Sequence, residues 1–378
     1  MQESSEASPV SLKIKFSSYR KKLQLQRKIK LQLHKEKLAL HKEKLQASQR
    51  KASKLHKNYD EIVKENSVKK LKSKSNIKID VEKIYTNKLC NCTRVGKYSK
   101  NQISNLPQST CSDFSTQRGK GQRVLSYSYY SIAKNLTKDS IYFKRYFEAI
   151  KYRVREAKRL YKGWTVKIYT NVTREDSYVN EILCEVYCNN DEVDLCDISN
   201  LPVFGAELKN HNGMFWRFLP LGDPTVDVFL SRDTDSVIQR REFDAVSEWL
   251  TTNKTFHVMR DHPFHSHLVL GGLWGAKNVN REELEILRNR IFAANDSHSY
   301  NYDQLILRNI VWPLAKNNVV QHDSFMCHKH EGSRAFPTAR EIDIYVGWGP
   351  YGKEEALKIF QKTMCPLQCR KKPEWTRC

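Results

Sequence analysis

Several features that this sequence lacks limit the class of protein to which it can belong. No window of eighteen apolar residues occurs, so no transmembrane helix is expected. The first thirty residues contain no apolar segment of the kind found in secretory signals. No glycine-rich loop with the Lys and Ser or Thr of a Walker motif is present. Aromatic residues, by contrast, form 11 % of the 378 residues, which is enough for a large core and excludes a wholly disordered chain.

The first 89 residues differ in composition from the rest of the chain. They contain no cysteine, tryptophan or glycine, and they carry 24 of the 65 Lys and Arg residues against 9 acidic residues. We therefore expect a basic helical or disordered extension at 1–89, a linker at 90–122 and a folded domain at 123–378. A solvated basic segment is one interpretation of the extension. An arm that binds nucleic acid or an anionic membrane is the other.

After residue 122 the hydrophobic pattern alternates between strands and helices. Short apolar runs predict strands, and apolar residues at helical spacing predict the segments between them. The predicted strands are 123–129, 164–169, 192–196, 226–231 and 255–259, and the predicted helices are 143–160, 175–187 and 240–250. Such an alternation is typical of an α/β sheet with helices on its faces.

Two carboxylates, Asp233 and Asp235, follow the apolar strand predicted at 226–231. Ligands of open α/β sheets bind at the carboxyl ends of the strands, so this position favours a site. Two carboxylates that are two residues apart can bind one Mg²⁺ or Mn²⁺ ion, which in turn bridges to the phosphates of a nucleotide. The alternative is a turn or an N-cap of the helix that begins near Gln239.

Further segments occur in a characteristic order along the chain. They are 161–169 (YKGWTVKIY), 213–219 (GMFWRFL), 232–236 (RDTDS), 241–249 (REFDAVSEW), 256–263 (FHVMRDHP), 271–275 (GGLWG), 302–305 (YDQL) and 322–324 (HDS). Together they resemble nucleotide-sugar glycosyltransferases of the GT-A type, and more closely a group of uncharacterised glycosyltransferase-like proteins. The resemblance covers about 60 % of the chain, from about residue 123 to 348, and none of the basic extension.

The resemblance implies a GT-A-like, Rossmann-like mixed sheet flanked by helices. It also implies that Asp233 and Asp235 hold the diphosphate of the donor through Mn²⁺ or Mg²⁺. A further metal ligand late in the chain is implied as well, and His322 lies at a suitable place. The identity of the sugar and of the acceptor is not implied.

Other residues near the ends of predicted elements are candidates for donor binding. Arg232 and Arg260 lie at predicted strand ends, where they would stabilise a leaving diphosphate; surface ion pairs are the alternative. Gly271 and Gly272 would let the backbone approach a sugar or phosphate closely, unless they form an ordinary turn.

Asp303 and Gln304 open a predicted helix, where Asp can cap and Gln can reach the site. We expect Gln304 to bind the donor. Asp303 is the leading candidate for the catalytic base or for a group that binds the sugar or the acceptor.

Two groups of residues raise the possibility of zinc instead. One is His257, Asp261, His262, His265 and His267, and the other is Cys327, His328 and His330 with Cys365 and Cys369. Pro263 excludes a helix that would present the first set on one face. A polar loop at the cleft is therefore favoured for the first group, and disulfides or free thiols are favoured for the second.

The ten cysteines and the five sequons are typical of a protein of the secretory pathway, whereas no signal is visible. The sequons are at Asn91, Asn135, Asn171, Asn253 and Asn295. Two compartments stay open. These are the Golgi or endoplasmic reticulum lumen, if the N-terminus is truncated or atypical, and the cytoplasm otherwise.

The sequence predicts a metal-dependent glycosyltransferase. It would move a sugar from a nucleoside-diphosphate sugar to a hydroxyl of a glycan, a protein or a small molecule. The alternative is a nucleic-acid-binding protein that acts through its basic arm and has a non-catalytic α/β domain. A phosphoryl- or nucleotidyl-transfer enzyme that uses the same carboxylates is a third hypothesis.

Overall fold

The computed structural model describes residues 83–130, 137–294, 299 and 301–378. The chain divides into two units, Met1–Ile79 and Asp80–Cys378; the first lies outside the described residues, and the second is compact and contains all of them. Most of the predicted basic extension and the sequons at Asn135 and Asn295 lie outside the described residues. None of the helices described has both the length and the apolar composition needed to span a bilayer.

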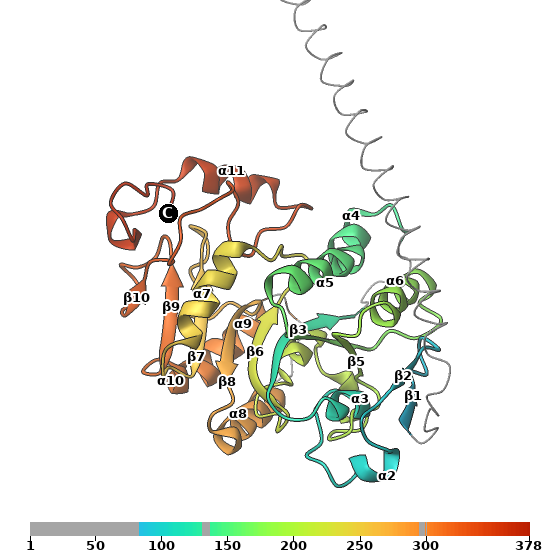
Figure 1. Ribbon diagram of the computed structural model, residues 1–378. Coiled ribbons are helices and arrows are strands. Elements are labelled where there is room, and N and C mark those ends of the chain that lie inside the picture. Colours follow the sequence, from blue (N-terminus) through green and yellow to red (C-terminus); the bar gives the residue numbers. More distant parts are fainter. Residues whose placement is uncertain (1–82, 131–136, 295–298, 300) are drawn as a thin grey trace, which may run out of the picture. The chain divides into compact units, whose positions relative to one another are not determined.

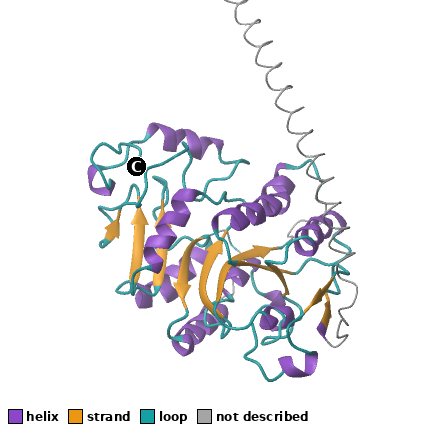
Figure 2. Ribbon diagram, viewed as in Figure 1, coloured by secondary structure: helices purple, strands orange, loops and turns teal. Residues whose placement is uncertain are grey.

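One eight-stranded mixed sheet organises the second unit (Figures 1 and 2). Its strands are β3 (Gln122–Tyr129), β4 (Thr165–Thr170), β5 (Val193–Asp197), β6 (Val226–Arg232), β7 (Phe256–Arg260), β8 (Leu273–Lys277), β9 (Val319–Asp323) and β10 (Ser333–Arg334). They lie in the order β10-β9-β7-β8-β6-β3-β4-β5. All neighbouring strands are parallel except at β8, which runs antiparallel to both β6 and β7.

Because β8 runs antiparallel to β6, the first residues of β8 lie at the edge of the sheet where β6 ends. Arg232 at the end of β6 pairs with Leu273 at the start of β8. The residues just before β8 therefore lie at the same edge of the sheet as the residues just after β6. The predicted Rossmann-like sheet flanked by helices is confirmed.

Helices cover both faces of the sheet. They are α5 (Ala149–Leu160), α6 (Ser177–Cys188), α7 (Arg240–Leu250), α8 (Arg281–Ala293), α9 (Tyr302–Ile306) and α10 (Trp312–Ala315). A short helix α4 (Ile141–Phe143) continues through a π-helical turn η2 (Lys144–Glu148) into α5, and a second π-helical turn η5 (Leu307–Val311) joins α9 to α10. The last helix, α11 (Glu354–Lys362), lies in the C-terminal segment. Two short 3₁₀ segments, η3 (Glu207–Asn210) and η4 (Gly213–Phe218), precede β6, and a third, η6 (Leu367–Cys369), lies near the C-terminus.

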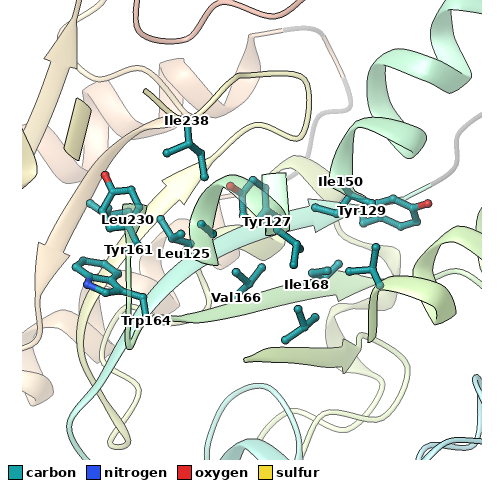
Figure 3. Close-up of a cluster of buried hydrophobic side chains, with 14 of the residues drawn as sticks. Leu125, Tyr127, Tyr129, Ile150, Tyr161, Trp164, Val166, Ile168, Leu230 and Ile238 are labelled. Atoms are coloured by element: carbon teal, nitrogen blue, oxygen red, sulfur yellow. The ribbon is translucent and has the colours of Figure 1, made fainter. Parts of the chain in front are cut away.

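Two apolar clusters fill the space between the sheet and its helices. Successive residues of a strand point to opposite faces, so Leu125 joins the cluster beneath α5, α6 and α7 while its neighbour Val124 joins the cluster beneath α8. Figure 3 shows part of the first cluster, including Leu125 of β3 and Val166 of β4, which are opposite each other in the sheet. This burial explains why the apolar runs of the sequence located the five predicted strands, which correspond to β3, β4, β5, β6 and β7.

The segment predicted as a linker belongs to the folded unit instead. It contains β2 (Thr93–Val95), which pairs with β1 (Ile84–Thr86), and the short helices α2 (Lys100–Ile103) and α3 (Asp113–Gln117). Three disulfides attach this segment to the domain, namely Cys90–Cys184, Cys92–Cys188 and Cys111–Cys196. The polar composition of the segment predicted a linker, and the disulfides that attach it to the domain have no local signal in the sequence.

The remaining four cysteines tie down the C-terminal segment. Cys327 pairs with Cys369 and Cys365 pairs with Cys378, so no cysteine of the chain is free. The preference for disulfides or thiols over a zinc site is thereby confirmed. Phe325, Tyr345 and Phe360 form a third apolar cluster with two of these cysteines beneath α11.

Candidate functional site

A cleft of about 790 Å³ opens at the carboxyl ends of β3 and β6. Its walls include the end of β3, η2, η3, η4, the turn after β6, the loop after β7, the residues before β8, and the first turn of α9. Lys353 contributes from the C-terminal segment. Of the predicted site residues, Asp233, Asp235, Gly271, Gly272, Asp303 and Gln304 all line this cleft.

Arg217 of η4 joins two carboxylates of the cleft. Its Nη1 forms an ion pair with Asp233, and its Nη2 donates to Oδ2 of Asp303 at 2.8 Å. The backbone N–H of Arg217 donates to Oγ of Ser128 at 3.0 Å, which anchors η4 to the end of β3. One guanidinium thus links the turn after β6 to the start of α9, two segments that are far apart in the sequence.

The two carboxylates that share Arg217 have opposite pKa shifts. Burial raises the pKa of Asp233, but the positive charges of Arg217 and Lys353 outweigh that effect and hold the pKa below its ordinary value. Burial also raises the pKa of Asp303, and there the charge of Arg217 only partly offsets it. Asp233 is therefore the stronger candidate for a permanently charged ligand, and Asp303 for a group that accepts a proton.

The glycine pair before β8 makes room for these carboxylates. A Cβ on Gly271 would lie 2.0 Å from Oδ2 of Asp303, and a Cβ on Gly272 would lie 2.0 Å from Oδ2 of Asp233. No side chain fits at such distances without displacement of the carboxylate. The glycine pair therefore lets the backbone approach the acidic side chains of the site, and its approach to a sugar or phosphate stays a prediction.

Asp235 has a different set of partners. Its Oδ2 accepts from Nε of Arg145 at 2.8 Å and lies 3.2 Å from Nζ of Lys353. Arg145 comes from η2 and Lys353 from the residue before α11, so two segments on either side of the turn after β6 converge on one carboxylate. Asp235 is buried, which strengthens both interactions.

Arg232 and Arg260, predicted to bind the donor, are core residues outside the cleft. Arg232 forms a buried ion pair with Glu242 of α7 and donates to the carbonyl oxygen of Gly272 at 3.1 Å. Arg260 donates to Asp323 at 2.7 Å. Alternation along β6 places Arg232 on the same face as Leu230, toward α7, and this orientation explains the difference from the prediction.

His322, the predicted third metal ligand, is not near the Asp pair. It is buried in β9, and the strands β7 and β8 lie between β9 and β6. Its Nδ1 lies 2.8 Å from Nε2 of His257, and its Nε2 lies 3.7 Å from Oε2 of Glu248 on α7. Its register in the strand directs the ring toward α7, so the carboxyl-end position inferred from the sequence does not bring it to the cleft.

The histidines considered for zinc are dispersed. His257 stacks on Trp249, His262 and His265 pack against Tyr345, and His265 and His267 line the cleft. Asp261 forms buried ion pairs with Arg340 and Arg241. In the described parts of the chain, one group of three ligand-type residues lies close enough for a metal, Asp323 with Cys327 and Cys369, and its two cysteines form a disulfide.

Sequence reasoning missed Arg217, Arg145 and Lys353 as site residues. Arg217 lies within one of the segments that carried the resemblance, so a search for basic partners of the acidic pair within those segments would have included it. Arg145 lies on a helix whose pattern shows only its apolar face. Lys353 lies after the last predicted strand, where no local pattern marks it.

Comparisons with known proteins do not assign a family. No protein-family model matches the chain, and no curated protein matches it. Among the solved structures that match it, two do so at low similarity. One is a glycosyltransferase involved in the glycosylation of the major capsid of PBCV-1, at 14 % identity and a TM-score of 0.33, covering 54 % of this chain and 82 % of that one.

The other is 4-diphosphocytidyl-2C-methyl-D-erythritol synthase from Anaerococcus prevotii DSM 20548. Its identity is 9 % and its TM-score 0.32, and the match covers 54 % of this chain and 88 % of that one. Similarity at this level carries no argument about function. The case for a function therefore depends on the cleft itself.

Proposed function

We propose that this protein transfers a sugar from a nucleoside-diphosphate sugar to a hydroxyl acceptor, with Mn²⁺ or Mg²⁺ bound at Asp233 and Asp235. The observation that supports this most strongly is the convergence of Asp233, Asp235 and Asp303 on one cleft at the carboxyl end of β6. A volume of about 790 Å³ lies within the range of pockets that hold small ligands and cofactors.

The residues of the cleft fit a hard divalent cation. Asp233 and Asp235 offer carboxylate oxygens, which Mg²⁺ and Mn²⁺ prefer, and in the structure each is paired with a basic side chain that a cation would have to displace. Glycine at 272 leaves the carboxylate of Asp233 the space that a side chain would occupy. A bound cation would neutralise the charge that develops on the diphosphate as the bond to the sugar breaks.

The remaining residues of the cleft have separate roles in this proposal. Asp303 would accept the proton of the acceptor hydroxyl, because a buried carboxyl with a raised pKa is suited to that task. Arg217 would keep Asp303 and Asp233 in their relative positions. Gly271, Gly272 and Gln304 would form the surface against which the donor lies.

Turnover of a panel of nucleotide sugars by the wild-type chain and by Asp235→Asn tests the proposal. The measurement is release of nucleoside diphosphate with Mn²⁺, with Mg²⁺ and with a chelator. We expect metal-dependent release by the wild type and a loss of at least about 100-fold in the variant, the scale of losing one preorganised electrostatic group. Asp227→Asn is the matched control, because Asp227 lies on the same strand, half-exposed and paired with Arg281.

Two results would refute the proposal. One is full metal-dependent turnover by Asp235→Asn, which would remove the metal assignment. The other is the absence of turnover and of thermal stabilisation by every nucleotide sugar of the panel. Release of pyrophosphate from a nucleoside triphosphate and a sugar phosphate would instead assign the same carboxylates to nucleotidyl transfer.

A further inference from the structure

Asp235, one of the two proposed cation ligands, already has two positively charged partners. Arg145 donates to it at 2.8 Å and the ammonium group of Lys353 lies 3.2 Å from the same oxygen. Nζ of Lys353 also donates to the carbonyl oxygen of Gly347 at 2.8 Å. Both basic side chains line the cleft, so they face the space that a ligand would enter.

The backbone holds Lys353 in this position. The N–H of Val237, just after the acidic turn, donates to the carbonyl oxygen of Trp348 at 2.7 Å. A Cβ on Gly349 would lie 1.7 Å from the carbonyl oxygen of Asp235, so the two backbones are in direct contact there. The C-terminal segment therefore packs against the turn that carries Asp235 and places the ammonium group beside its carboxylate.

Among the described residues, the charges that line the cleft nearly cancel. These residues provide three carboxylates, Asp233, Asp235 and Asp303, and four basic side chains, Arg145, Lys209, Arg217 and Lys353. A cation that enters alone is repelled by the two basic groups on Asp235. A diphosphate that enters alone competes with the carboxylates for the same basic groups. A cation and a diphosphate that enter together satisfy both sets of charges at once.

We propose that Arg145 and Lys353 are diphosphate-binding residues that exchange Asp235 for the diphosphate when the cation and the diphosphate bind together. In the free protein they neutralise Asp235. In the complex they contact the diphosphate, and Asp235 becomes available to the cation. The inference rests on the cation and diphosphate of the proposed function and adds that each strengthens the binding of the other.

Binding of Mn²⁺ to the full chain, with and without inorganic pyrophosphate, tests this exchange. Free Mn²⁺ is measured by electron paramagnetic resonance, each titration is compared with a protein-free titration at the same pyrophosphate concentration because pyrophosphate itself binds Mn²⁺, and no turnover is required. For Lys353→Met we expect Mn²⁺ alone to bind about tenfold more tightly than in the wild type, because a competing positive charge is gone. In the presence of pyrophosphate we expect Mn²⁺ to bind about tenfold more weakly, because a phosphate ligand is lost.

Lys358→Met is the matched control. Lys358 lies on α11, is exposed and pairs with Glu355 outside the cleft, so this variant should bind Mn²⁺ like the wild type under both conditions. Thermal unfolding of each variant identifies a loss of fold. If Lys353→Met does not fold, Arg145→Gln removes the other basic partner from a different element and is expected to shift the two affinities in the same opposite directions.

Opposite shifts of the two affinities would support the exchange. Weaker binding under both conditions, or no change under either, would overturn it, because a purely structural role for Lys353 gives no tightening. Equal Mn²⁺ affinity of the wild type with and without pyrophosphate would overturn it as well. If the two Mn²⁺ affinities shift in opposite directions but no nucleotide sugar is turned over, the exchange of partners is supported and only the proposed sugar donor is rejected.

Discussion

Replacement of Arg217 by methionine should destabilise the protein by an amount that depends on pH. Methionine keeps much of the length of the side chain and removes its charge. Arg217 is 7 % exposed and Asp303 is 4 % exposed, so the ion pair is largely out of water. Removal of one partner of a buried pair costs roughly 3–5 kcal/mol, because the other charge stays buried without compensation. With an unfolding entropy of about 2.1 cal/mol/K per residue, a unit of roughly 300 residues should lose about 5–8 °C in Tm.

The sign of the pH dependence follows from Asp303. Burial raises the pKa of this carboxyl in the folded protein, and Arg217 partly lowers it. Without Arg217 the pKa rises further, so the folded variant binds the proton more tightly than the unfolded chain does. An acid whose folded pKa is raised loses stability as pH rises through its unfolded value of about 3.9 and toward its folded value. The destabilisation should therefore be smallest near pH 4 and should grow toward pH 7.

Urea denaturation of the wild type and of Arg217→Met at pH 5 and pH 7 measures both effects. The double variant Arg217→Met/Asp303→Asn is the control, because the second substitution removes the charge that the first leaves unpaired. It should recover part of the lost free energy of unfolding at pH 7 and less at pH 5. A loss below about 1 kcal/mol at pH 7, the range of exposed ion pairs, would refute the reasoning. So would a loss that is equal at both pH values.

Two further predictions concern the glycine pair and the buried histidines. Gly272→Ala should weaken Mn²⁺ binding, because the added methyl would lie 2.0 Å from Oδ2 of Asp233. The control is Gly163→Ala, which should leave Mn²⁺ binding unchanged because no atom lies within 4 Å of the added methyl, although φ is +79° there. Equal Mn²⁺ binding by the two variants would contradict this prediction. Burial lowers the pKa of His257 and of His322, so the folded protein keeps them neutral while the unfolded chain binds protons below about pH 6.5. The free energy of unfolding should then be fully present above that pH and fall below it, by up to about 1.4 kcal/mol per pH unit for each histidine. His322→Gln should reduce this slope in chemical denaturation, and an unchanged slope would contradict the assignment.

The sequence by itself determined the α/β class and the position of the acidic pair. Apolar runs such as that of β6 are buried by the helices on both faces, and burial is the property that hydrophobic periodicity reports. Asp233 follows β6 directly, so the end of the apolar run was enough to predict that Asp233 lies at a strand end. Asp303 likewise lies in the first turn of a helix, as its sequence context predicted.

Only the tertiary structure decided which charged groups meet in the cleft. Arg217, Arg145 and Lys353 reach the carboxylates from three segments that are far apart in the sequence, and no local pattern specifies such a convergence. The sequence predicted Arg232 and His322 to be site residues only because each lies at the end of a predicted strand. Their side chains point toward α7 instead, because the face to which a strand residue points depends on the register of the sheet and on what packs against it. The partners of a charge follow from that long-range packing, and the sequence records only where the charge lies along the chain.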